Sequence, residues 1–175
     1  DVYKRQVSII DTNHGKEKMK KIKEYQMMLN ENRIPYLETQ KSFLCESKCN
    51  SPANVAKIME SCFRISDLPE EHIYAIALNT KNQITGIFEV GKGTVNCSLI
   101  SAREILIRML LAGAVSFILC HNHPSGDTNP SQEDIQITES IGKAGSLIGV
   151  SLLDHLIIGE KNYTSLREIQ AVTFE

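Results

Sequence analysis

The chain has 175 residues, 42% of them hydrophobic, which is enough for one domain with an ordinary core. Its formal net charge of −2 at pH 7 excludes a strongly basic protein, so charge gives no support to nucleic acid as a partner. The sequence also lacks the ~18–20 consecutive apolar residues of a membrane-spanning helix, so we expect no membrane partner.

The cysteines predict the redox environment of the protein. Their number, five, is odd, and no two of them have the CxxC spacing of a thiolate metal site or a redox motif. Cys45 and Cys49 are the only close pair, and no second pair exists to complete a four-thiolate site. We therefore interpret the cysteines as free thiols and expect a cytoplasmic protein.

The N-terminal part of the chain predicts a lead-in to the main domain. Residues 16–32 are rich in Lys, Glu, Met and Gln with sparse apolar positions, which predicts a helix that is only partly covered. Residues 36–45 predict a short extended segment. We therefore divide the chain into a helical and extended lead-in over residues 1–50 and a core domain over residues 51–175.

The first half of the core domain predicts a helix followed by strands. Ser51 suits the N-cap and Pro52 the first position of a helix that reaches about residue 63. Apolar strands are expected over residues 72–78 and 83–90, joined by a turn, and a third over residues 94–99.

The second half alternates helices with apolar strands. Ser101 and Glu104 have the spacing of a capping box at the start of a helix over residues 101–113. The elements expected after it are a buried strand at 115–120, a helix at 132–148, strands at 150–154 and 155–159, and a closing strand at 163–166. This order predicts an α/β (α+β) fold, a mixed β-sheet with flanking helices.

His121 and His123 follow the buried strand and predict a metal site. Residues i and i+2 of a strand share a face, so both imidazoles lie on one side, at the strand end where α/β folds usually place their sites. Asp134 lies in the first turn of a helix capped by Ser131, where the helix dipole favours an ionised carboxylate. Two imidazoles and one carboxylate leave a fourth zinc position open to water, as in catalytic sites.

Simpler interpretations exist for the same residues. A His-x-His pair alone is a weak signal for metal. Ser131 and Asp134 together have the pattern of a capping box, which needs no metal to explain it. Asp154 and His155 also have a purely structural interpretation, as a buried pair whose hydrogen-bonding groups are satisfied.

A metal-dependent hydrolase also needs a general base that takes a proton from water and delivers it to the leaving group. The sequence offers no geometry with which to choose one. Four carboxylates qualify on their position near predicted strands or helices, namely Glu70, Glu71, Glu89 and Glu104.

The histidine stretch and the acid after it match a known motif. His121, His123 and Pro124, followed at the required spacing by Ser131 and Asp134, resemble the JAMM motif of the MPN (JAB) metalloprotease fold. The fuller string, with shorter matches at 93–96, 103–105 and 153–159, is similar to the RadC branch of that superfamily. The resemblance covers roughly residues 51–168 and implies a JAB/MPN (cytidine deaminase-like) architecture for the core domain.

The resemblance implies a role for each residue of the motif. His121, His123 and Asp134 would hold Zn²⁺. Ser131 would hydrogen-bond the attacking water or help to stabilise the oxyanion, and Glu71 would be the general base, with Glu70 as the fallback.

The chain departs from the wider family in two places. Deubiquitinating members carry Ser or Thr between the histidines, whereas this chain has Asn122. Full-length RadC proteins carry an N-terminal helix-hairpin-helix region that binds DNA, and the first residues here show no such signature, so we expect a short form that lacks it.

These features lead to one main functional expectation and two alternatives. We expect a zinc metallopeptidase or isopeptidase-type hydrolase that cleaves an amide bond in a peptide or protein. The first alternative is a DNA-associated protein in repair or mobile-element biology, which a basic face on the folded domain would favour. The second is a non-catalytic MPN scaffold with a structural metal.

Overall fold

The computed structural model of the protein describes residues 19–93 and 101–174. In chain order its elements are β1 (Lys20–Leu29), β2 (Pro35–Cys45), α1 (Pro52–Phe63), a 3-10 turn (Ile65–Asp67), β3 (Glu71–Leu78), β4 (Ile84–Gly93), α2 (Ala102–Leu111), β5 (Ser116–Asn122), α3 (Gln132–Leu147), β6 (Ser151–Ile158) and β7 (Tyr163–Ser165). The strands form one sheet in the order β2-β1-β4-β3-β5-β6-β7. The pairs β1–β4 and β5–β6 are parallel and the others antiparallel, so the predicted mixed sheet with flanking helices is confirmed.

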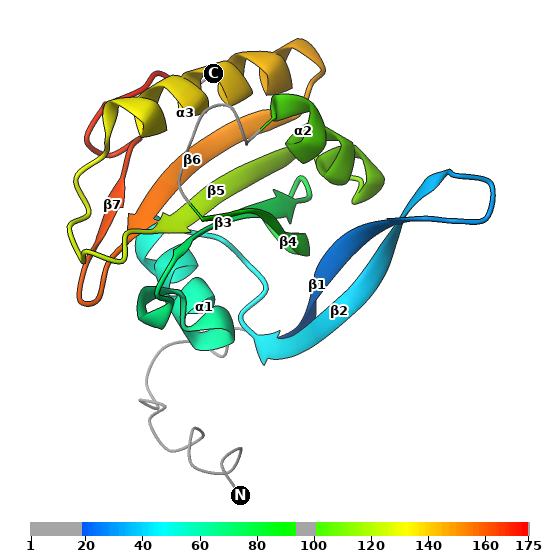
Figure 1. Ribbon diagram of the computed structural model, residues 1–175, viewed down its shortest axis with the longest axis horizontal. Helices are drawn as coiled ribbons and strands as arrows, with labels where there is room; N and C mark the ends of the chain where they lie inside the picture. The colour runs from blue at the N-terminus through cyan, green and yellow to red at the C-terminus, as the bar shows by residue number, and fades with distance from the viewer. Residues whose placement is uncertain (1–18, 94–100, 175) are drawn as a thin grey trace, which may run out of the picture.

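Helices cover both faces of the sheet, with α2 and α3 on one face and α1 on the other (Figure 1). Successive residues of β3 pack on opposite sides, because Ile73 belongs to the cluster under α2 and α3 and Tyr74 to the cluster under α1. Every residue of β5 is buried, which explains its continuous apolar sequence. Within the described ranges, no helix is long and apolar enough to cross a membrane.

β1 and β2 form a long hairpin that extends away from the rest of the molecule (Figure 1). The predicted helix over residues 16–32 is therefore wrong, since residues 20–29 are a strand. Local helix preference is overridden here because pairing with β2 satisfies the backbone, Ile22 enters the core, and the Tyr25 ring lies 5.9 Å from that of Phe88. The extended segment predicted over residues 36–45 is confirmed as part of β2.

The hairpin belongs to the same sheet as the core domain. β1 pairs in parallel with β4, through Glu24 and Ile87. The first described residues therefore extend the central sheet instead of forming a helical lead-in. The proposed division between residues 50 and 51 stays a prediction.

Two further expectations need correction. The strands predicted at 150–154 and 155–159 are one strand, β6, because a parallel register with β5 continues through Asp154 and His155. Ser101 is the N-cap of α2 but makes no capping hydrogen bond through its side chain, and the Glu104 carboxylate pairs with Arg103 and Arg108 instead. The strand predicted over residues 94–99 lies outside the described residues.

The fold brings the end of β5 and the start of α3 to the same edge of the sheet (Figure 1). The connecting loop turns at Gly126, whose φ of +78° suits glycine. The loop then packs closely on the end of β6, because a Cβ atom at Gly159 would lie only 2.7 Å from the Gly126 backbone oxygen. This packing fixes the path from the histidines to the acid of α3.

Candidate metal centre

The end of β5 and the residue that follows it present the two histidines on the α3 side of the sheet. In the antiparallel register with β3, His121 lies opposite Ile73, which packs under α2 and α3. Opposite residues of an antiparallel pair share a face, and so do residues two apart on one strand. His121 and His123 therefore share that face, while Asn122 between them lies on the α1 side with Cys120.

The first turn of α3 supplies the carboxylate. Ser131 is the N-cap, and the predicted capping box is present: Ser131 Oγ accepts from the Asp134 backbone N–H at 3.0 Å, and the Ser131 backbone N–H donates to Asp134 Oδ2 at 2.8 Å. The Ser131 hydroxyl donates to the same Oδ2 at 2.7 Å. The cap therefore engages one carboxylate oxygen and leaves Oδ1 beside His121.

Three ligand atoms converge between these two elements. His121 Nε2 lies 2.9 Å from His123 Nε2 and 3.3 Å from Asp134 Oδ1, and His123 Nε2 lies 3.5 Å from Asp134 Oδ2. The three residues form a group that could hold a metal ion, with ligand atoms all within 4.8 Å of one another. His121 and Asp134 are fully buried and 14% of the His123 side chain is exposed, so the centre faces solvent at His123.

The outer nitrogen of each histidine also has a hydrogen-bond partner. His123 Nδ1 lies 2.6 Å from the backbone oxygen of Asp127, which can only accept, so this nitrogen carries a proton. His121 Nδ1 lies 2.8 Å from Nε2 of the buried His155 on β6. Such partners fix the ring orientation of metal-ligating histidines, and here they turn both Nε2 atoms inward.

The donor set fits a metal ion. Asp134 Oδ1 is buried and accepts no hydrogen bond from the part of the chain that the structure describes. When His123 is neutral, its proton lies on Nδ1, so a bare Nε2 also faces the centre. A cation satisfies such converging acceptors together, and two imidazole nitrogens with one carboxylate oxygen are ligands typical of an open zinc site.

Burial and mutual contact set the protonation of the three residues. Burial lowers the pKa of His121 well below 6.5 and keeps the ring neutral. A hydrogen bond with Asp134 raises the pKa of His123. Burial alone would raise the pKa of Asp134, but the contacts with His123, His121 and Ser131 outweigh it and hold that pKa below its ordinary value. The carboxylate is therefore ionised, which is its ligand form.

The structure separates the four candidate bases. Glu71 is the first residue of β3, two positions before Ile73, so it lies on the same face as the histidines. Its negative charge is the last of the causes that raise the pKa of His123. The other candidates are engaged elsewhere: Glu70 with Lys92 at 3.0 Å, Glu89 with His72, and Glu104 with Arg103 and Arg108.

Asn122 holds the segment that carries Glu71. Its buried side chain accepts a hydrogen bond from the His72 backbone N–H at 2.7 Å and donates to the backbone oxygens of Leu68 and Glu70 at 3.2 and 2.9 Å. These bonds fix the backbone on both sides of Glu71 against the end of β5. An amide can make all three, whereas a Ser or Thr hydroxyl has only one proton to donate.

Two residues lie behind the centre in positions that the sequence did not predict. His155 is buried and contacts His121, and Thr138, one turn after Asp134 on α3, contacts His155. Asp154 and His155 are both buried, as expected, but their side chains join different networks. The Asp154 carboxylate instead accepts from the Ser165 hydroxyl and from backbone N–H groups, including that of His155.

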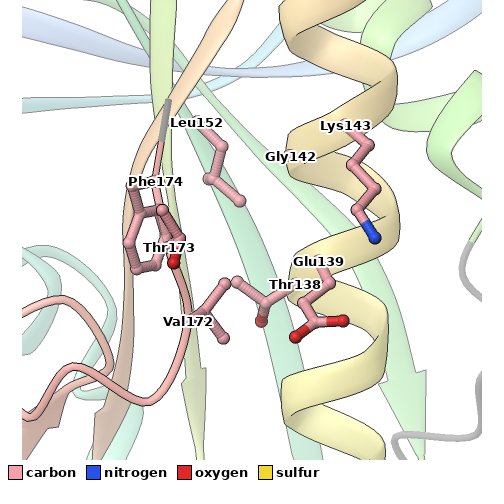
Figure 2. Close-up of a pocket in the computed structure, with 8 residues that line it drawn as sticks. All are labelled: Thr138, Glu139, Gly142, Lys143, Leu152, Val172, Thr173 and Phe174. Carbon is pink, nitrogen blue, oxygen red and sulfur yellow. The ribbon is translucent and has the colours of Figure 1, made fainter.

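A cavity of about 220 Å³ lies between α3, β6 and the C-terminal segment (Figure 2). It is lined by Thr138, Glu139, Gly142, Lys143, Leu152, Val172, Thr173 and Phe174. No residue of the His-His-Asp group lines this cavity, so it is separate from the metal centre. Thr138 is the lining residue that also belongs to the network behind His121.

A mixed sheet whose strand ends in His-x-His beside a capped helix with an acid is the arrangement of a JAB/MPN-type domain. Sequence comparison agrees, since a model of the RadC-like JAB domain matches residues 49–171. The chain therefore belongs to the RadC-like JAB domain family, and the resemblance seen in the sequence is confirmed.

Curated relatives of the chain include several clostridial proteins. A UPF0758 protein of Clostridium acetobutylicum is 44% identical over 121 residues, which is 69% of this chain and 52% of the relative. A UPF0758 protein of Clostridium beijerinckii is 41% identical over 130 residues, or 74% of this chain and 56% of the relative. The chain thus spans about half the length of the curated relatives it matches.

Proposed function

We propose that the chain is a zinc-dependent hydrolase that cleaves an amide bond in a peptide or protein substrate. The observation that carries this proposal is the convergence of His121 Nε2, His123 Nε2 and Asp134 Oδ1 at a centre that faces solvent on one side. Membership of the RadC-like JAB domain family supports it.

The three side chains would hold the zinc ion and leave one position open. When bound, zinc would lower the pKa of a water to about 7 and polarise the scissile carbonyl. The chain's own contribution begins with orientation, because Ser131 engages one oxygen of Asp134 and leaves the other facing the histidines. This contact adds a positioning role to the one proposed for Ser131, which is to assist the attacking water or the developing oxyanion.

Glu71 is the proposed general base. It lies on the face of the sheet that carries His123, in a segment fixed by Asn122, and its charge helps to raise the pKa of His123. A carboxylate held in this way takes a proton from the attacking water and passes it to the leaving amine. Glu70 is a poorer candidate because it lies one residue before Glu71, and adjacent residues of an extended chain point to opposite faces of the sheet. Its carboxylate pairs with Lys92 at 3.0 Å.

A peptide substrate screen with matched glutamine variants tests this assignment. Glu71→Gln should bind zinc as the wild type does but lose turnover by roughly 10²–10⁴-fold, and should retain substrate as a trap. Glu70→Gln is the control and should keep both zinc and turnover. A fully active Glu71→Gln protein would show that the base is misassigned. Zinc-loaded wild-type protein that cleaves no amide substrate across the screen would count against the hydrolase itself.

A further inference from the structure

A continuous chain of hydrogen bonds lies behind the metal centre. His121 Nδ1 lies 2.8 Å from His155 Nε2, and His155 Nδ1 lies 2.6 Å from Thr138 Oγ1. Thr138 Oγ1 in turn lies 2.5 Å from the backbone oxygen of Asp134. All four residues are at most 1% exposed. This series of hydrogen bonds thus begins at the side chain of one proposed ligand, His121, and ends at the backbone of another, Asp134.

The last hydrogen bond, from Thr138 to Asp134, determines which group donates in every other bond of the series. A carbonyl oxygen can only accept, so the single proton of the Thr138 hydroxyl goes to Asp134. Thr138 Oγ1 must then accept from His155 Nδ1, which leaves Nε2 of a neutral His155 without a proton. That bare nitrogen accepts from His121 Nδ1. Neutral His121 therefore keeps its lone pair on Nε2, the nitrogen that faces His123 and Asp134.

If every donor and acceptor in this series were exchanged, His121 could not bind a metal through Nε2. With its proton on Nε2, His155 would donate to His121 Nδ1, and the proton of neutral His121 would lie on Nε2. A nitrogen that carries a proton cannot ligate a metal. This arrangement also requires the Thr138 hydroxyl to donate to His155. No proton would then lie between Thr138 Oγ1 and the Asp134 backbone oxygen, although these two atoms are only 2.5 Å apart. The close Thr138–Asp134 contact therefore excludes it.

The geometry points to Thr138 and His155 as positioning residues that hold His121 in the tautomer able to bind a metal through Nε2. This inference rests on the metal centre proposed above. Thr138 lies one helical turn after Asp134, so a single turn of α3 supplies both a ligand and the group that selects the tautomer of another ligand.

Histidine tautomers in the chelator-treated full chain give the first test. Long-range ¹H–¹⁵N correlation spectra of ¹⁵N-labelled protein report which ring nitrogen carries the proton. Thr138→Val removes the hydroxyl at similar size, and Thr138→Ser keeps it as the matched control. We expect His121 to be protonated at Nδ1 in the wild type and in Thr138→Ser, and to shift toward Nε2 in Thr138→Val.

Zinc affinity, measured by competition with a chromophoric chelator, gives the second test. Thr138→Val should bind zinc roughly 10–100-fold more weakly than the wild type, the usual effect of losing such a partner, while Thr138→Ser binds like the wild type. Wild-type protein that takes up no zinc overturns the metal centre together with this inference. Wild type and Thr138→Val that bind zinc equally well overturn the role of Thr138 alone.

The wild-type spectrum also keeps the inference falsifiable if Thr138→Val fails to fold. Protonation of wild-type His121 at Nε2, with Nδ1 bare, contradicts the proposed direction of the chain without any variant. Protonation at Nδ1, with His155 also protonated at Nδ1, supports it.

Discussion

The network behind the metal centre and the β1–β2 hairpin hold their residues in place by different means. In the network, His121, Thr138 and His155 are at most 1% exposed, and their side chains contact one another through specific atoms. In the hairpin, backbone pairing sets the structure, and most β2 side chains are exposed. Side-chain identity should therefore matter atom by atom in the network and far less in the hairpin.

Loss of a proposed ligand should have the largest effect. His123→Ala leaves one histidine and one carboxylate, too few for a stable zinc site, so zinc binding should be abolished at micromolar concentrations. His72→Ala is the control, because His72 pairs with Glu89 outside the His-His-Asp group. Equilibrium dialysis followed by metal analysis measures both. Retention of zinc by His123→Ala would remove that residue from the ligand set.

Loss of the buried Asn122 amide should cost the most stability. Asn122→Ala removes three hydrogen bonds to backbone groups around Glu71. Because each buried group left unsatisfied costs about 1–3 kcal/mol, we expect the free energy of unfolding of metal-free protein to fall by about 3 kcal/mol. Denaturant titration measures the loss, with Asn129→Ala, at an exposed position, as control. Equal stability of the two variants would contradict the role given to Asn122.

Zinc itself should stabilise the folded chain. At a free zinc concentration of 100 times Kd, binding adds about 2.7 kcal/mol, which corresponds to a rise in Tm of about 5–10 °C for a chain of this size. Thermal unfolding with zinc and with chelator measures the rise. An equal rise in His123→Ala would place the responsible zinc elsewhere.

The two serine N-caps should separate helix stability from metal affinity. Ser131 and Ser51 each accept a backbone N–H in the first turn of a helix, but only Ser131 also holds the Asp134 carboxylate. Alanine at either position should lower stability by about 1 kcal/mol. Only Ser131→Ala should also weaken zinc binding, by roughly tenfold or more. Unchanged zinc affinity in Ser131→Ala would limit Ser131 to capping.

The smallest effect is expected in the hairpin. Leu44 on β2 is 71% exposed, so Leu44→Ser should change the free energy of unfolding by no more than about 0.5 kcal/mol. Denaturant titration of the metal-free protein provides the comparison with Asn122→Ala. A loss of several kcal/mol at Leu44 would mean that an exposed hairpin side chain stabilises the fold as strongly as the buried Asn122 amide does.

The parts of the site that could be predicted are close in sequence. His121 and His123 share a strand face by spacing alone, and the capping pattern at Ser131 and Asp134 places the acid in the first turn of a helix. The structure brings the three predicted ligands together as expected. The resemblance already favoured Glu71 over Glu70, but the geometric reason for that choice comes from the β3–β5 register, which no local pattern reveals.

The parts that could not be predicted depend on tertiary contacts. His155 is 34 residues from His121, and Thr138 is 17 residues from His155, so their contacts follow from the β5–β6 register and the packing of α3. The first strand of the hairpin, β1, was predicted as part of a helix because Lys, Glu and Met favour helix locally, while its pairing with β2 and β4 decided the outcome. The central strands were predicted correctly, because burial on both faces gives them apolar sequences without interruption.

Zinc stoichiometry tests the central claim most directly. Wild-type protein and Asp134→Ala would be stripped with chelator, incubated with excess zinc, desalted and analysed for protein-bound metal. A single centre at His121, His123 and Asp134 predicts about one zinc per wild-type chain and none in the variant. A folded wild-type protein that remains free of zinc, or an Asp134→Ala protein that holds as much zinc as the wild type, would contradict it.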